Sequence, residues 1–189
     1  MKSNHEEEYE QFIIKSIERT EKLGLENNEF KINKNLVVDL ELINKLALEM
    51  IELRDNHNIP RQITISDCGA MSYTLQQLLQ EHGIPALITI GDVIEVGKAR
   101  YKTTVQSLKN EIEKGISNDQ VYLHVWLTLP NMHIIDTTLL LKSQKNKFIN
   151  KKLDYIKDGL YSQVKINNRA IFKPMIVGST FLYKIGLLR

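Results

Sequence analysis

The chain has 189 residues, 42% of them hydrophobic and 25% charged, which is enough for one domain with a substantial core. Its net charge of +2 at pH 7, without a stripe of basic and aromatic residues, does not indicate a nucleic-acid-binding protein. No apolar run reaches the roughly 18 residues of a membrane span, and the single cysteine excludes an intramolecular disulfide bond. We therefore expect neither a nucleic acid nor a membrane as a partner.

The N-terminal segment MKSNHEEEYEQF is acidic and polar and lacks the apolar core of a signal peptide. One cysteine gives no sign of an oxidising compartment. We expect a cytoplasmic protein, and signal-independent secretion is compatible with the same sequence. The high Lys, Asn and Ile content is typical of an AT-rich, bacterial genome, and the oligomeric state is left open.

Two helices are predicted in the N-terminal part of the chain. Residues 6–23 place apolar side chains at helical intervals among Glu and Lys, and Gly24 follows as a stop signal. Residues 25–37 are polar and rich in asparagine, which predicts a loop. A second helix is expected to begin at Asp39, a good N-cap, and to end before Pro60.

A third predicted helix has the clearest boundaries. Ser66 and Asp67 are both good N-caps, and Gly83 followed by Pro85 ends the helix. The lone cysteine, Cys68, then lies in the first turn, where unpaired backbone N–H groups and the helix dipole stabilise an anion such as a thiolate. The structural alternative is that Cys68 is a small buried apolar residue, which is the commoner role of a lone cysteine.

Strands are predicted in the second half. Residues 86–91 indicate a short buried strand, and residues 92–120 a charged excursion that is loosely helical around residues 105–112. Residues 171–177 and 181–185 are expected to be further strands. Helices followed by antiparallel strands are typical of an α+β fold.

Between these segments the sequence predicts a pair of strands, residues 121–129 and 133–139, joined by a turn at Pro130. Asp136 lies in an apolar strand, where an unpaired carboxylate would be costly to bury, and His124 is a natural partner. A two-residue loop would turn Asp136 away from His124. A three-residue loop places the two side chains diagonally on one face, so a His–Asp pair requires an odd-length loop or a bulge.

Cys68, His124 and Asp136 are the candidate catalytic residues. An imidazole beside a thiol can take its proton and later return it to a leaving amine, while a carboxylate orients the ring. Trp126, on the same strand face as His124, and Gly69, which leaves room beside the sulfur, are candidates for substrate binding. The structural alternative for His124 is a satisfied histidine without a catalytic role.

These residues carry a resemblance to a family. The run DCGAMSYTLQQLLQEHGIPAL, which includes Cys68, resembles the nucleophile helix of transglutaminase-like proteins. The later runs HVWL and IIDTT resemble the family's histidine and aspartate segments. The resemblance covers residues 62–140 and implies a papain-like arrangement, with the cysteine helix packed on an antiparallel sheet. Gln62, six residues before Cys68, has the spacing of the papain-like oxyanion glutamine. The chain departs from the pattern in having Asp67 where the family often has glycine.

We therefore predict a single transglutaminase-like domain over residues 1–189, with a helical part (1–58) and a catalytic core (59–189). The predicted activity is hydrolysis of an amide or peptide bond in a protein or peptide substrate. The alternatives are a transglutaminase or acyltransferase with an amine acceptor, a non-catalytic binding module on the same fold, and an interaction protein that binds through its N-terminal helices. No cofactor is expected. No metal is expected either, because His57, His82 and His133 lack metal-ligand spacing.

Overall fold

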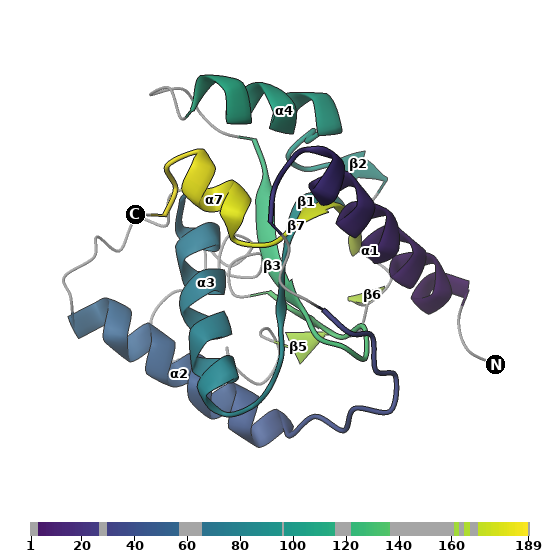
Figure 1. Cartoon of the computed structure of the whole chain (residues 1–189). Coiled ribbons are helices and arrows are strands. Elements are labelled where there is room, and N and C mark those ends of the chain that lie inside the picture. Colours follow the sequence, from purple (N-terminus) through teal and green to yellow (C-terminus); the bar gives the residue numbers. More distant parts are fainter. Residues whose placement is uncertain are drawn as a thin grey trace.

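A computed structural model describes residues 4–26, 30–56, 66–95, 97–115, 122–136, 161–162, 165–166 and 170–188 (Figure 1). The helices are α1 (Asn4–Lys22), α2 (Leu40–Asn56), α3 (Ser66–Glu81), α4 (Val105–Lys114) and α7 (Thr180–Lys184). The strands are β1 (Leu87–Glu95), β2 (Lys98–Ala99), β3 (His124–Thr128), β4 (Ile134–Ile135), β5 (Tyr161–Ser162), β6 (Lys165–Ile166) and β7 (Ala170–Val177). The predicted α+β class is confirmed.

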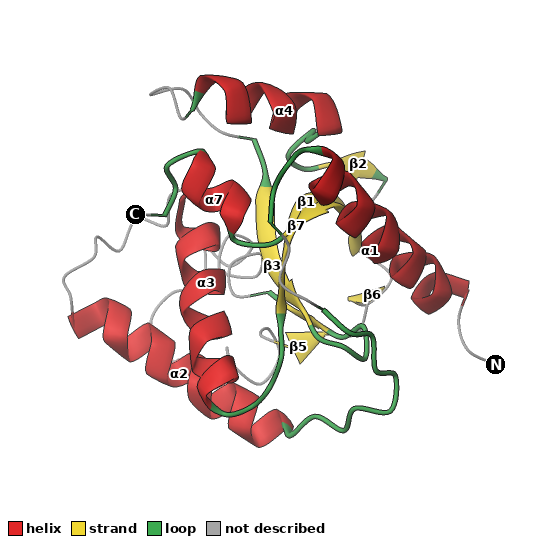
Figure 2. Ribbon diagram, in the orientation of Figure 1, coloured by secondary structure: helices red, strands yellow, loops and turns green. Residues whose placement is uncertain are grey.

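Within the described ranges the strands form one sheet in the order β5-β4-β3-β1-β7-β6, with β2 paired to β1. Every pair is antiparallel. Figures 1 and 2 show α1 on one side of this sheet and α2, α3 and α7 on the other. Because both faces are covered, β3 is buried along its whole length and β1 along most of it.

The predicted helix boundaries in the first half are confirmed. Gly24 and Gly83 follow α1 and α3 with φ angles of 65° and 70°, a backbone conformation that glycine adopts without strain. The Asp39 carboxylate accepts hydrogen bonds from the backbone N–H groups of Glu41 (3.0 Å) and Leu42 (3.1 Å), so Asp39 is the N-cap of α2. Local sequence signals therefore place these helix ends.

The prediction of a strand over residues 181–185 is wrong, because residues Thr180–Lys184 form the helix α7. Its apolar and aromatic residues suggested a strand. Leu182 and Ile185 follow Phe181 by one and four residues, however, so all three share a helix face. All three are buried in the cluster on the α3 side of the sheet. Tertiary burial of that face outweighs the strand preference of the segment.

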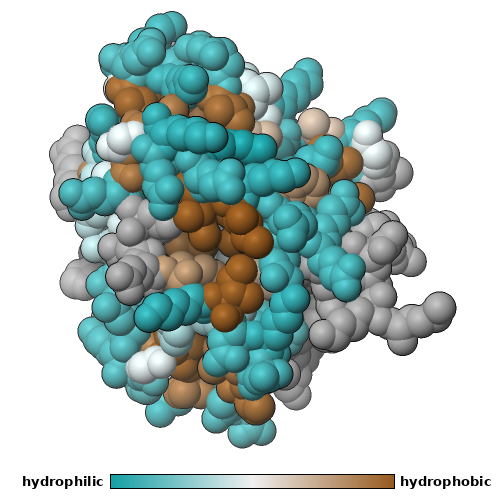
Figure 3. Space-filling view, turned by 45° about the vertical axis from the view of Figure 1, so that its right-hand side comes forward, coloured by the Kyte–Doolittle hydropathy of each residue, from teal (hydrophilic) through white to brown (hydrophobic). Residues whose placement is uncertain are grey.

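Helix α4 confirms the helical stretch predicted within residues 92–120. Its Thr104 N-cap forms a reciprocal pair of hydrogen bonds with Ser107, and Leu108 is buried. Figure 3 shows hydrophilic atoms over the top of the molecule, where α4 lies, and apolar atoms beneath them. None of the helices in the described ranges is long and apolar enough to span a membrane.

A chain of buried hydrogen bonds attaches α1 to the sheet. The indole of Trp126 donates to the hydroxyl of Tyr9 (2.9 Å), which is bonded to Thr128 (2.7 Å). Thr128 is bonded to Thr89 (2.8 Å), whose hydroxyl donates to the carbonyl of Leu87 (3.2 Å). The side chains of Tyr9, Trp126, Thr128 and Thr89 therefore all have hydrogen-bond partners, which is the condition for burying polar groups at low cost.

Strands β1 and β7 approach closely at Gly91. The pairing shifts between Ile90 and Gly91, and Met175 is the extra residue of this bulge. Pro174, which has no N–H group, is tolerated inside a sheet at such a place. A Cβ atom on Gly91 would lie 2.0 Å from the carbonyl oxygen of Lys173, so only glycine fits there.

We predict that Gly91→Ala lowers the free energy of unfolding by about 3 kcal/mol or more, because the new methyl group overlaps a backbone atom that cannot move without breaking the sheet. Gly24→Ala is the control. A Cβ atom there meets no atom within 4 Å, so only the cost of a left-handed backbone remains, about 1–2 kcal/mol. Urea denaturation of both variants measures the difference, and equal losses would contradict the prediction.

Candidate active site

The hairpin that joins β3 and β4 brings His124 and Asp136 together. Leu127 pairs with Ile135, so residues 130–132 form a three-residue loop. This is the odd-length loop that a His–Asp pair requires, and that register is confirmed. His124 Nε2 lies 2.6 Å from Asp136 Oδ2, and both side chains are buried.

The turn explains why this register forms. Met132 has a φ angle of 68°, the left-handed residue that often closes a three-residue hairpin loop. The backbone N–H of Leu129 donates to the carbonyl of His133 (2.8 Å), which closes the hairpin. Asn131 donates from its side chain to the carbonyl of Leu36 (3.0 Å), so the preceding loop also holds the turn.

Cys68 lies in the first turn of α3, as predicted, and its side chain is 1% exposed. One turn further on, the hydroxyl of Ser72 donates to the carbonyl of Val125 (3.3 Å). This bond ties α3 to the strand that carries His124. The cap roles predicted for the side chains of Ser66 and Asp67 lie outside the described residues.

The charge state of His124 is set by opposing effects. Burial by itself lowers the pKa of the imidazole, because the charged ring is desolvated. The carboxylate of Asp136, through its charge and its hydrogen bond, and then the thiol of Cys68 outweigh burial and raise the pKa of His124 to about 9. Asp136 and Cys68 therefore favour the protonated form of the ring.

The thiol of Cys68 interacts with the ring of His124. Nε2 of His124 is occupied by Asp136, so Nδ1 is the nitrogen that remains for Cys68. Nδ1 has no partner of good hydrogen-bond geometry in the described part of the chain, yet Cys68 affects the pKa of His124 both by hydrogen bonding and by charge. Hydrogen bonds of catalytic groups often tighten only when substrate binds.

Aromatic rings surround His124. The ring of Tyr101 stacks on the imidazole, with 5.0 Å between centroids and 4° between planes. Trp126 and Phe172 lie at 5.8 Å and 6.5 Å from it. Sequence reasoning missed Tyr101, because it lies in the charged excursion and belongs to no motif.

Sequence reasoning also missed Asp92, which holds the segment that carries Tyr101. Its buried carboxylate accepts hydrogen bonds from the backbone N–H groups of Val93 (2.7 Å), Tyr101 (2.9 Å) and Thr103 (3.1 Å). Lys102, between two of these donors, has a φ angle of 55°. Converging backbone N–H groups bind anions, and here the bound anion is the Asp92 carboxylate.

The other predicted site residues are placed as follows. Gln62 lies outside the described residues. Gly69 is buried, and its Cα faces the side chain of Leu182 on α7, because a Cβ added there would lie 3.7 Å from it. Trp126 is fully buried and bonded to Tyr9, so it contacts the imidazole from within the core. In the ranges that the structure describes, no group of three His, Cys, Asp or Glu residues could hold a metal ion.

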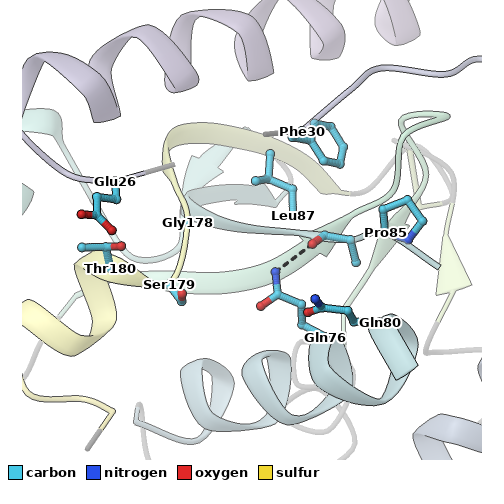
Figure 4. A pocket seen from close by; sticks show the side chains of 10 residues that line it. Glu26, Phe30, Gln76, Gln80, Pro85, Leu87, Gly178, Ser179 and Thr180 are labelled. Carbon is cyan, nitrogen blue, oxygen red and sulfur yellow. Dashed lines mark hydrogen bonds between the residues drawn. The ribbon is translucent and has the colours of Figure 1, made fainter. Parts of the chain in front are cut away.

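A separate cavity of about 170 Å³ lies near the opposite end of α3 from Cys68 (Figure 4). Gln76 on its wall donates to the carbonyl of Ala86 (2.7 Å). Glu26 and Phe30 approach from the segment that follows α1. None of Cys68, His124 and Asp136 lines this cavity, so it is not part of the candidate active site.

Comparisons of the chain with protein-family models, with curated proteins and with solved structures found no match.

Proposed function

We propose that the protein is a cysteine-dependent acyl-transfer enzyme that hydrolyses an amide or peptide bond in a protein or peptide substrate. The observation that carries the proposal is the buried His124, with one ring nitrogen on the Asp136 carboxylate and the thiol of Cys68 close to the ring. A nucleophile, a base and a group that orients the base are the parts that such a reaction needs.

In the first step the Cys68 thiolate attacks the carbonyl carbon of the substrate, and an S–C bond forms. The C–N bond of the amide then breaks, and the His124 imidazolium gives its proton to the leaving amine. Asp136 keeps a hydrogen bond to Nε2, which leaves Nδ1 as the proton donor. The backbone N–H of Cys68 in the first turn of α3 is suited to stabilise the oxyanion.

In the second step water attacks the thioester, the S–C bond breaks, and a carboxylic acid leaves. His124 must now act as a base. Acylation removes the negative charge and the hydrogen bonding of Cys68, both of which raise the pKa of His124 in the free protein. Burial and Asp136 remain, so the pKa of the imidazole falls at the point where a base is required.

We infer the transglutaminase-like, papain-like form of the α+β fold as part of the same proposal. Its support is a helix that carries Cys68 near its start, packed on the antiparallel strand that carries His124, with Asp136 directly after the next strand, β4. Transfer to an amine, as in a transglutaminase, would use the same first step. Water is favoured as the acceptor because nothing in the described residues marks an amine site.

A binding module without turnover is the second candidate function. The burial of Cys68, with 1% of its side chain exposed, favours it, because substrate does not reach a sulfur that stays enclosed. The two functions differ in one respect that can be measured, which is the reactivity of the thiol in the folded protein.

We predict that iodoacetamide alkylates Cys68 in the folded protein at a rate that depends on His124, because an imidazolium beside a sulfur stabilises the reactive thiolate. His124→Ala should lower the rate at pH 6 by about 10-fold or more. His82→Ala is the control, since the His82 ring is exposed on the surface of the molecule. A rate that is insensitive to His124→Ala, or no reaction in the folded protein, would support the binding module instead.

We predict that the pair stabilises the fold in a pH-dependent manner. The pKa of His124 is raised in the folded protein from 6.5 to about 9, so its contribution is complete below pH 6.5 and is lost as pH rises through 9. Relative to His124→Phe, the wild type should lose about 3 kcal/mol of unfolding free energy between pH 6 and pH 10.

Urea denaturation at several pH values measures this difference. Asp136→Asn is the comparison variant, because it removes the negative charge that opposes the effect of burial. The pH dependence should shrink in Asp136→Asn, and a difference between wild type and His124→Phe that does not change with pH would contradict the assignment.

A further inference from the structure

The candidate active site is closed. Cys68 is 1% exposed, His124 is fully buried and Tyr101 is 6% exposed. A substrate can reach the sulfur only if a side chain moves. The ring of Tyr101 covers the imidazole in a parallel stack. The charges of Cys68 and Asp136 act on its phenol group, so Tyr101 contacts His124 and lies near the other two proposed catalytic residues.

Tyr101 also lines a cavity of about 310 Å³ between its own segment and α4. Helix α4 contributes Ser107, Leu108 and Glu111 to its lining, and Tyr122 lies on the opposite segment. Tyr122 is 58% exposed, so this cavity reaches the molecular surface. Among the residues that line it, Tyr101 is the one whose ring contacts His124.

We propose that Tyr101 determines which acyl donors reach Cys68, because its ring separates this cavity from the thiol–imidazole pair. The inference rests on the proposed thiol chemistry and adds a route and a selecting residue to it. Substrate approaches through the cavity, and outward movement of the Tyr101 ring joins the cavity to the sulfur. The size of the group attached to the carbonyl then decides how far the ring must move.

The segment that carries Tyr101 is built to hold the ring in place. Asp92 binds the backbone on both sides of Lys102, whose left-handed conformation costs about 1–2 kcal/mol. The hydroxyl of Thr103 donates to the carbonyl of Tyr122 (2.9 Å), which fixes the end of the segment. Loss of the Asp92 contacts would release this strain and with it the position of the ring.

The test compares two reagents that differ only in size, iodoacetamide and N-benzyl iodoacetamide. Both reagents form the same S–C bond and release iodide. The rate of each reagent with Cys68 is divided by the rate of the same reagent with glutathione, which corrects for their intrinsic reactivity. The wild type should react with the benzyl reagent at least about 10-fold more slowly than with iodoacetamide. Tyr101→Ala should reduce this difference between the two rates to about twofold. The ratio of the two rates is the readout, because a change in thiol reactivity affects both reagents equally.

Two control variants separate selection from general loosening of the site. Tyr101→Phe keeps the ring and should keep the wild-type ratio. Phe172→Ala removes another aromatic ring beside His124 that does not line the cavity, so it should also keep the ratio even if it lowers the melting temperature. An unchanged ratio in Tyr101→Ala, or an equal change in Phe172→Ala, would overturn the proposal.

Asp92→Asn provides a second variant that leaves the ring intact. It should lower the discrimination as Tyr101→Ala does, because an amide cannot accept hydrogen bonds at both of the atoms that now bind the segment. If Tyr101→Ala changes the ratio while His124→Ala leaves both rates unchanged, Tyr101 is the selecting residue and the proposed function is wrong. If His124→Ala lowers both rates while Tyr101→Ala leaves the ratio unchanged, the proposed function stands and the role of Tyr101 is wrong.

Discussion

The register of the β3–β4 hairpin is the constraint on which the candidate active site depends. Successive side chains of a strand point to opposite faces, so a slip of one residue would move Asp136 away from His124. Both side chains are buried, and an unpaired carboxylate in that place would cost several kcal/mol. The hydrogen bond between them and the left-handed turn at Met132 therefore favour the same register.

The site draws on both sides of the sheet. Cys68 belongs to the apolar cluster between α3 and the sheet. Tyr101 and Trp126, which flank the imidazole, belong to the cluster between α1 and the sheet. His124 is the first residue of β3 and contacts both groups. The geometry of the thiol and the imidazole consequently depends on how two layers pack, and the hydrogen bond from Ser72 to β3 fixes one of those layers.

Local signals in the sequence were sufficient for the helix ends, because a cap such as Asp39 or a glycine such as Gly24 acts on its own backbone. The His–Asp pair was predictable because a buried carboxylate demands a partner and the hairpin limits the choice. The segment 181–185 was not predictable in the same way. Its apolar residues satisfy either a strand or a short helix, and only packing against α3 decides between them.

Tyr101 and Asp92 could not be predicted, since their roles depend on contacts between β1 and a segment that follows β2. Asp92 has the composition of a surface residue in a charged stretch, and its burial results from three backbone donors that converge on it. A carboxylate that binds backbone leaves no pattern in side-chain types. Residues of this kind are found only once the backbone is known.

The position of β7 bears on how the chain folds during synthesis. Strand β7 lies between β1 and β6 and also contacts α1, so residues 170–177 join segments made much earlier. Until β7 emerges from the ribosome, on the order of several seconds after β1, one edge of β1 has no strand to bind. The hydroxyl of Thr20 on α1, which accepts a hydrogen bond from the Val177 N–H in the folded protein (2.9 Å), also lacks this partner until β7 emerges. From the emergence of β1 until that of β7 the nascent chain thus carries an open sheet edge, and a chaperone that covers this edge would protect it from aggregation.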